Sequence, residues 1–219
     1  PSGRVLKKGN IGADWQIGTN HEQKFSYSFN VSSDNVRKFS SDGSSTGHYT
    51  ANELRKVETT DENGNKVITF TDALGRAVLK RVQLDDMQEG TMVDYLETYT
   101  IYDDFGRVKY TLSPKAVAAF AANSWTFSQS VIDEFGYEYK YDSLGRVIEK
   151  KVPGSAWVYY GYDDLDRLVL MQDGILRGTN QWMFIKYDKK HRAVMQGLYT
   201  DAVNVTRSAI QSVLDGLYT

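Results

Sequence analysis

Three pairs of adjacent aspartates carry the acid–base chemistry that this sequence most readily suggests. A glycoside hydrolase needs two carboxyl groups that face each other across a sugar, roughly 5–9.5 Å apart. Adjacent residues in a turn point apart, and Asp forms turns because its carboxylate accepts hydrogen bonds from nearby backbone N–H groups. We therefore interpret the pairs as turn residues and predict that the chain is not an enzyme, with a glycoside hydrolase as the alternative. The pairs are Asp85-Asp86, Asp103-Asp104 and Asp163-Asp164.

Metal and cofactor chemistry has little support in the sequence. The segment 61–65 resembles the start of a calcium loop, but its Gly comes fourth rather than sixth, and Asp72 takes the place of the final Glu. Asn63-Gly64 is also a strong signal for a type I′ hairpin turn. The histidines, at 21, 48 and 191, lack zinc-ligand spacing, and there is no cysteine to form a thiolate or a disulfide. We predict no cofactor and no metal.

Rows of aromatic residues are the best candidates for binding. Exposed rows of this kind bind sugar rings or protein surfaces. More often they are the packed face of a sheet, and we favour that interpretation. The candidate ligand-binding residues are Trp157, Tyr159, Tyr160 and Trp182.

The composition favours β-structure and excludes some partners. The 219 residues include 15 Tyr, 9 Phe and 4 Trp but only 3 Pro, and aromatic residues suit pleated, half-buried surfaces. The net charge of -2 provides no basic surface for nucleic acid. The longest apolar stretch, 116–122, is far short of the ~20 residues that span a bilayer. The chain begins at Pro1 without a signal peptide, so we expect a fragment of a longer protein.

A recurring Tyr-Asp-x-x-Gly-Arg motif organises the middle of the chain. Its copies begin at 71, 102, 141, 162 and 187, and the irregular spacing indicates hairpins of varying length rather than a strict solenoid. The motif residues are Asp72, Gly75 and Arg76; Tyr102, Asp103, Gly106 and Arg107; Tyr141, Asp142, Gly145 and Arg146; Tyr162, Asp163 and Arg167; and Tyr187, Asp188 and Arg192.

Each motif predicts a strand, a tight turn and a return strand. Alternating residues lead into the Asp, whose carboxylate can bond backbone N–H groups two residues on. The Gly can adopt a positive φ at no steric cost, and Asp166 and His191, which replace it in two copies, are residue types that tolerate this conformation. The Arg opens the return strand and can pair with the Asp across the turn.

The other segments suggest three parts. Residues 1–47 are predicted as an N-terminal β segment and loop, with a strand over 25–31 and a Gly/Ser-rich loop over 40–47. Residues 48–200 form the repeat sheet, in which Pro153-Gly154 and Asp173-Gly174 mark further turns. Short helices are expected near 114–122, after the Ser113-Pro114 start signal, and near 206–215 in a C-terminal part, 201–219.

The motif resembles the YD repeat of the RHS (rearrangement hotspot) and teneurin superfamily. The resemblance covers roughly residues 48–200, and the segment 141–173 is especially similar to RHS-repeat proteins of Bacteroidetes. The sequence departs from the pattern at Thr71, which replaces the Tyr, and at Asp166 and His191, which replace the Gly.

This resemblance implies a section of a large secreted or cell-surface protein. In the family, the repeats form a β-strip that spirals into a shell, which in bacterial members often encloses a C-terminal toxin or effector. We therefore expect a mainly β fold, a meander of antiparallel YD-repeat hairpins forming a curved sheet, whose partner is the remainder of the same polypeptide. The motif residues would be structural. The alternative is a carbohydrate- or protein-binding module that uses exposed aromatic residues.

Overall fold

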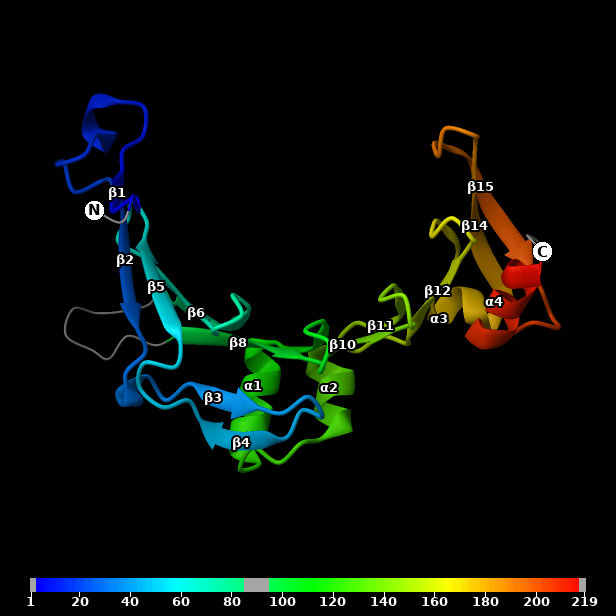
Figure 1. Ribbon diagram of the computed structural model, residues 1–219, viewed down its shortest axis with the longest axis horizontal. Helices are drawn as coiled ribbons and strands as arrows, with labels where there is room; N and C mark the ends of the chain where they lie inside the picture. Colours follow the sequence, from blue (N-terminus) through cyan, green and yellow to red (C-terminus); the bar gives the residue numbers. More distant parts are fainter. Residues whose placement is uncertain (1–2, 85–94, 217–219) are drawn as a thin grey trace. The chain divides into compact units, whose positions relative to one another are not determined.

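The computed structural model describes residues 3–84 and 95–216 (Figure 1). The chain divides into two compact units, residues 1–128 (unit 1) and 129–219 (unit 2). In both units the main sheet is built from antiparallel strands, most of them paired with their neighbours in sequence, which confirms the predicted mainly β meander. The division into 1–47, 48–200 and 201–219 stays a prediction.

In unit 1 the main sheet has the strand order β1-β2-β5-β6-β7-β8-β9. Strand β2 confirms the strand expected near 25–31. The strands of this sheet are β1 (Lys7–Lys8), β2 (Gln23–Phe29), β5 (Arg55–Thr60), β6 (Lys66–Thr71), β7 (Ala77–Gln83), β8 (Tyr95–Tyr102) and β9 (Val108–Leu112). The remaining elements of unit 1 are the 3-10 turns η1 (Ala13–Trp15) and η2 (Ser32–Asp34), strands β3 (Arg37–Phe39) and β4 (Ser45–His48), and helix α1 (Pro114–Ala122).

A hairpin is inserted between the paired strands β2 and β5. Asn30, which is fully buried, ties its base together: the side-chain oxygen accepts from the Leu54 N–H at 2.7 Å, and the side-chain amide donates to the Thr50 carbonyl at 2.8 Å. The inserted strands β3 and β4 pair with each other. The prediction of a loop over 40–47 was therefore wrong for its last three residues, which belong to β4.

Aromatic residues join this hairpin to the sheet. The buried Tyr99 of β8 accepts a hydrogen bond from the Arg37 N–H through its hydroxyl oxygen, and its ring makes an edge contact with Phe39. Trp125 lies beside both rings. Helix α1 begins at the predicted Ser113 cap and packs on β8 and β9. In Figure 1, β3, β4 and α1 lie together beside β8.

In unit 2 the strand order is β10-β11-β12-β13-β14-β15. Helices α2 and α3 were not predicted. At the start of α3, Asp173-Gly174 was interpreted as a turn, whereas Asp173 caps the helix N-terminus and accepts from the N–H groups of Ile175 and Leu176. The elements are α2 (Gln129–Phe135), β10 (Gly136–Tyr141), β11 (Val147–Lys151), β12 (Val158–Tyr162), β13 (Leu168–Gln172), α3 (Gly174–Gly178), β14 (Gln181–Tyr187), β15 (Ala193–Thr200) and α4 (Arg207–Gly216).

Helix α4 covers the sheet of unit 2. Its apolar residues Ile210 and Leu214 form a core with Leu170 and Trp182. Gly161 lets the helix come close, since a Cβ there would lie 3.0 Å from the Leu214 side chain. Of the helices in the described residues, none has the length and hydropathy needed to cross a bilayer.

Candidate functional site

All five motif copies form the same closed turn. In the copy at 141–147, the Asp142 N–H donates to the Arg146 carbonyl at 3.1 Å, and the Gly145 N–H donates to the Asp142 carbonyl at 3.1 Å. One carboxylate oxygen of Asp142 accepts from the N–H groups of Leu144 and Arg146, and the other accepts from Arg146 Nε at 2.7 Å. The same bonds close the turns at 72–76, 103–107, 163–167 and 188–192.

The fourth residue of each turn has a positive φ, as predicted. Gly145 has φ 84°, while Asp166 and His191, which replace the glycine, have φ 59° and 60°. The turn therefore forms without glycine, at the cost of a left-handed backbone that an L-residue with a Cβ disfavours.

A sixth turn of the same kind lies at 61–65. Asp61 accepts from the N–H groups of Asn63 and Asn65, and the Asn65 side-chain amide takes the place of the arginine at 3.0 Å. The predicted hairpin is present, since β5 pairs with β6 across this turn, but its type was wrong: a type I′ turn needs a positive φ at both Asn63 and Gly64, and only Gly64 has one. Asp61, like the motif aspartates, directs its carboxylate to the turn. Among the described residues no cluster of three potential metal-ligating side chains occurs.

The turn aspartates Asp103, Asp142 and Asp163 have a pKa below the ordinary value. Burial alone would raise the pKa of Asp163, but hydrogen bonds from the Arg167 guanidinium and from backbone N–H groups outweigh it and hold the pKa below its ordinary value. The pKa values of Asp103 and Asp142 are lowered by the same opposition of burial and hydrogen bonds. The pairs Asp103-Asp104 and Asp163-Asp164 thus contain one carboxylate committed to the turn and one exposed residue. Asp85-Asp86 lies outside the described residues.

A contact that we call the Tyr–Arg clip joins successive turns. The tyrosine of one motif donates its hydroxyl to the carbonyl of the residue that follows the arginine of the previous motif, while that arginine lies over the tyrosine ring. The clips are Tyr102 to the Ala77 oxygen (2.9 Å) with Arg76 4.8 Å from the ring centroid, Tyr162 to the Val147 oxygen (2.7 Å) with Arg146 at 4.7 Å, and Tyr187 to the Leu168 oxygen (2.9 Å) with Arg167 at 5.1 Å.

The clip depends on how the strands alternate in direction. In an antiparallel meander, every second connection lies at the same end of the strands, so in unit 2 the turns at 142–146, 163–167 and 188–192 lie side by side at one end (Figure 1). A cation–π contact and a neutral hydrogen bond together contribute about 1–2 kcal/mol per clip. The clip was not predicted from the sequence, because the interval from each Arg to the next Tyr varies.

The candidate ligand-binding aromatic residues are partly or wholly covered. Trp182 has no exposed surface and packs in the core of unit 2. Trp157, Tyr159 and Tyr160 are half-buried. The Lys140 amine lies 4.2 Å from the centroid of the Trp157 ring, and the guanidinium of Arg177 lies 3.8 Å from that of Tyr159. The structure therefore does not bring these four side chains together on one open face.

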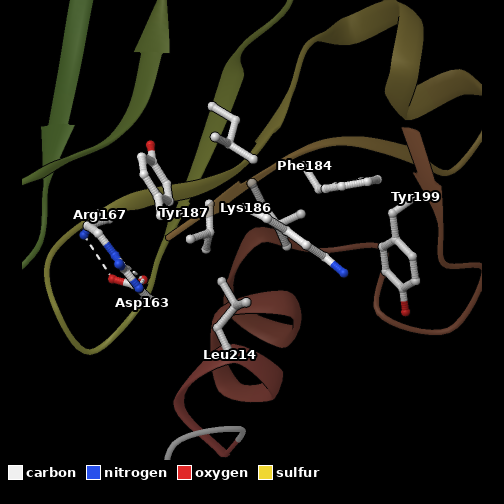
Figure 2. A pocket seen from close by; sticks show the side chains of 10 residues that line it. Asp163, Arg167, Phe184, Lys186, Tyr187, Tyr199 and Leu214 are labelled. Atoms are coloured by element: carbon white, nitrogen blue, oxygen red, sulfur yellow. Dashed lines mark hydrogen bonds and ion pairs between the residues drawn. The ribbon is translucent and has the colours of Figure 1, made fainter. Parts of the chain in front are cut away.

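A groove of about 470 Å³ lies between α4 and the sheet of unit 2. The Tyr199 hydroxyl donates to Asp201 at 3.1 Å, and this hydrogen bond raises the pKa of Tyr199. None of the four candidate aromatic residues lines the groove. Figure 2 shows its labelled residues: Asp163 with Arg167, Tyr187, Lys186, Phe184, Tyr199 and, from α4, Leu214.

Comparisons with known proteins agree with this architecture. A scan against protein-family models finds no match, and a search of curated proteins finds none. Among solved structures, the chain resembles the Photorhabdus luminescens Tc holotoxin pore with a TccC3 mutation, at a TM-score of 0.50 and 12% identity, over 92% of this chain and 10% of that chain. It also resembles TcdB2-TccC3, at a TM-score of 0.51 and 12% identity, over 90% of this chain and 10% of that chain. For TcdB2-TccC3 without its hypervariable C-terminal region the TM-score is 0.51 at 13% identity, over 83% and 9%.

At 12% and 13% identity these likenesses show the fold alone, and at that level they confirm the predicted resemblance to RHS/YD-repeat proteins. The chain spans about a tenth of the length of each neighbour. The special similarity to Bacteroidetes proteins stays a prediction.

Proposed function

We propose that this chain is a non-catalytic section of the wall of a larger RHS/YD-repeat β-shell, in a secreted or cell-surface protein whose shell encloses or presents a C-terminal effector. The observation that carries the proposal is the Tyr–Arg clip. Each clip fixes one hairpin to the next at the same end of the strands, so within each unit the motif builds a strip of sheet. A strip that grows by adding equivalent hairpins is suited to a wall.

The charges of the motif serve this structural role. Every motif aspartate in the five turns bonds backbone N–H groups and its own arginine, which leaves neither carboxylate oxygen without a partner. General acid–base catalysis needs a carboxyl group within hydrogen-bond reach of a substrate proton. The likeness to the Tc-toxin structures over a tenth of their length supports the same role at the level of fold.

Electron cryomicroscopy of the full polypeptide that contains this sequence tests the proposal. We expect the strands of residues 23–200 to lie in the wall of a hollow body that holds density for another segment. A particle without an enclosed space, with both faces of this sheet in solvent, would contradict the shell.

A binding role is the second candidate, and the groove in unit 2 favours it. Phe184 and Tyr199 offer aromatic surface beside the Lys186 amine, a combination that suits a sugar or a protein side chain. Titration calorimetry with a glycan panel tests it: binding that is lost in Phe184→Ala but kept in Trp157→Ala places the ligand in the groove. No heat with any glycan would remove the carbohydrate version.

A further inference from the structure

The outer edge of β15 is open. In the described part of the chain, β15 pairs with β14 alone and is the last strand of the sheet. Seven of its eight residues are exposed. They include Val194 and Leu198 on one face and Met195 on the other, with 62%, 58% and 55% of their surface exposed. An unprotected strand edge of this length and hydrophobicity is a surface on which another strand can pair.

The turn that leads into β15 has half of a Tyr–Arg clip. Its arginine, Arg192, has 71% of its side chain exposed, although it pairs with Asp188 at 2.7 Å as the other arginines pair with their aspartates. The arginines of the completed clips, Arg76, Arg146 and Arg167, have 31%, 21% and 20% exposed. Arg192 and the Ala193 carbonyl therefore occupy the same motif positions as Arg76 and Ala77 in their clip. No tyrosine among the described residues completes the clip at Arg192.

We propose that the edge of β15 receives an antiparallel strand that ends in a tyrosine followed by an Asp-x-x-Gly-Arg turn. The tyrosine hydroxyl donates to the Ala193 carbonyl, and the Arg192 guanidinium covers its ring. Backbone pairing provides affinity, as in other strand-addition complexes, and the clip fixes the register. Three clips between described residues already show that contact.

Strand β8 and its turn are a model of this partner taken from the same chain. In unit 1, β8 pairs antiparallel with β7, and its Tyr102 completes the clip with Arg76 and Ala77. Placed against β15 in the equivalent register, Tyr102 reaches Ala193. A synthetic peptide with the sequence of residues 95–112 is therefore the probe.

Hydrogen exchange of the 219-residue chain, with and without this peptide, tests the inference. We expect saturating peptide to slow amide exchange in residues 193–200 by about tenfold or more, because paired backbone N–H groups exchange only after opening. A peptide with Tyr102→Ala should bind about tenfold more weakly, from the loss of one hydrogen bond and one cation–π contact. Arg192→Ala in the protein should weaken binding about fivefold. Lys190→Ala, an exposed residue of the same turn, is the matched control and should bind as the parent does.

Three results would overturn the inference. The first is unchanged exchange in 193–200 at saturating peptide, and the second is equal affinity for the Tyr102→Ala peptide. The third is protection of 193–200 without peptide that rises with protein concentration together with dimer formation, which would make a second copy of this chain the occupant.

The inference rests on the proposed function, since it names what continues the wall, but the two can fail separately. If the full polypeptide forms a closed shell but the peptide does not bind at β15, the proposed clip at this edge is wrong and the proposed wall stands. Peptide binding at β15 without an enclosed space in the full polypeptide keeps the clip at this edge and removes the shell.

Discussion

The two ends of the strands in unit 2 are built by different rules. At one end, the three motif turns repeat one set of hydrogen bonds with small variation in length. At the other end, the connections differ: a short turn joins β11 to β12, α3 joins β13 to β14, and a loop after β15 leads to α4 (Figure 1). The end with the motif turns, which we call the motif end, fixes the strand pairing. The opposite end, which we call the variable end, supplies helices that cover the sheet. The irregular spacing of the motif follows, because the connections at the variable end differ in length and the strands themselves differ, from 5 residues in β11 to 8 in β15.

In unit 1 other elements cover the sheet. Its cover comes from α1 and from the hairpin inserted between β2 and β5, and an aromatic cluster of Tyr99, Phe39 and Trp125 joins that hairpin to the sheet. Unit 2 uses helix α4 over a core of Leu170, Trp182 and Ile210. The turns are the same in both units, so the fold tolerates different covers on one kind of strip.

The largest effect is expected at the variable end, from Trp182→Ala. The side chain is fully buried against α4, so its removal leaves a cavity and should lower the free energy of unfolding by about 3–5 kcal/mol. Urea denaturation followed by circular dichroism measures the loss. Trp157→Ala is the control: that ring is half-buried under Lys140, and its loss should cost clearly less. Equal losses would mean that α4 does not form the core described here.

Much of the motif end could be predicted from the sequence, because its interactions are local. The carboxylate of Asp142 reaches groups only two and four residues away, so residue types and spacing suffice. The start of α1 was predicted for the same reason, through Ser113 and Pro114. The sixth turn at Asp61 also carried a local signal, an Asp three residues before a Gly.

The variable end could not be predicted in the same way. Trp182 is buried because Ile210 and Leu214, on a helix much later in the chain, pack against it, and no local pattern reports that contact. Each clip likewise depends on which strands pair. Helix α3 has only five residues, too few for a periodic apolar pattern.

The second prediction concerns the motif end. Asp163→Ala removes a carboxylate with no exposed side-chain surface that accepts from the backbone N–H groups of Leu165 and Arg167 and from the Arg167 side chain. Because partly buried donors are left without an acceptor, we expect the free energy of unfolding to fall by about 2–4 kcal/mol. Asp188→Ala is the matched variant in the last turn, where the side chain is 25% exposed, and it should cost less. An equal cost in both turns would show that burial by the following hairpin adds nothing.

The third prediction is a loss of stability in acid. Because the folded pKa values of Asp103, Asp142 and Asp163 lie below the ordinary 3.8, the turns contribute their full stability above about pH 5 and lose it as the pH falls through 3.8 toward the lowered values. Urea midpoints measured between about pH 7 and pH 3 follow the loss. Asp163→Asn keeps an acceptor for the backbone but lacks the charge, so its midpoint should change less over the same range. A parent midpoint that does not fall with pH would contradict the role of the carboxylates.

The smallest effect is expected from restoring glycine at the two turn positions that lack it. His191 has φ 60° and no ion pair of its own in the described structure, so His191→Gly should raise the free energy of unfolding by about 0.5–1 kcal/mol through relief of the left-handed backbone. Asp166→Gly gives the same relief at φ 59° but removes the 2.7 Å ion pair with Arg146, so its gain should be smaller. Thermal unfolding of both variants beside the parent measures the difference. If His191→Gly destabilises the chain, the side chain at this position does more than occupy a turn, and the equivalence of the last turn to the others would fail.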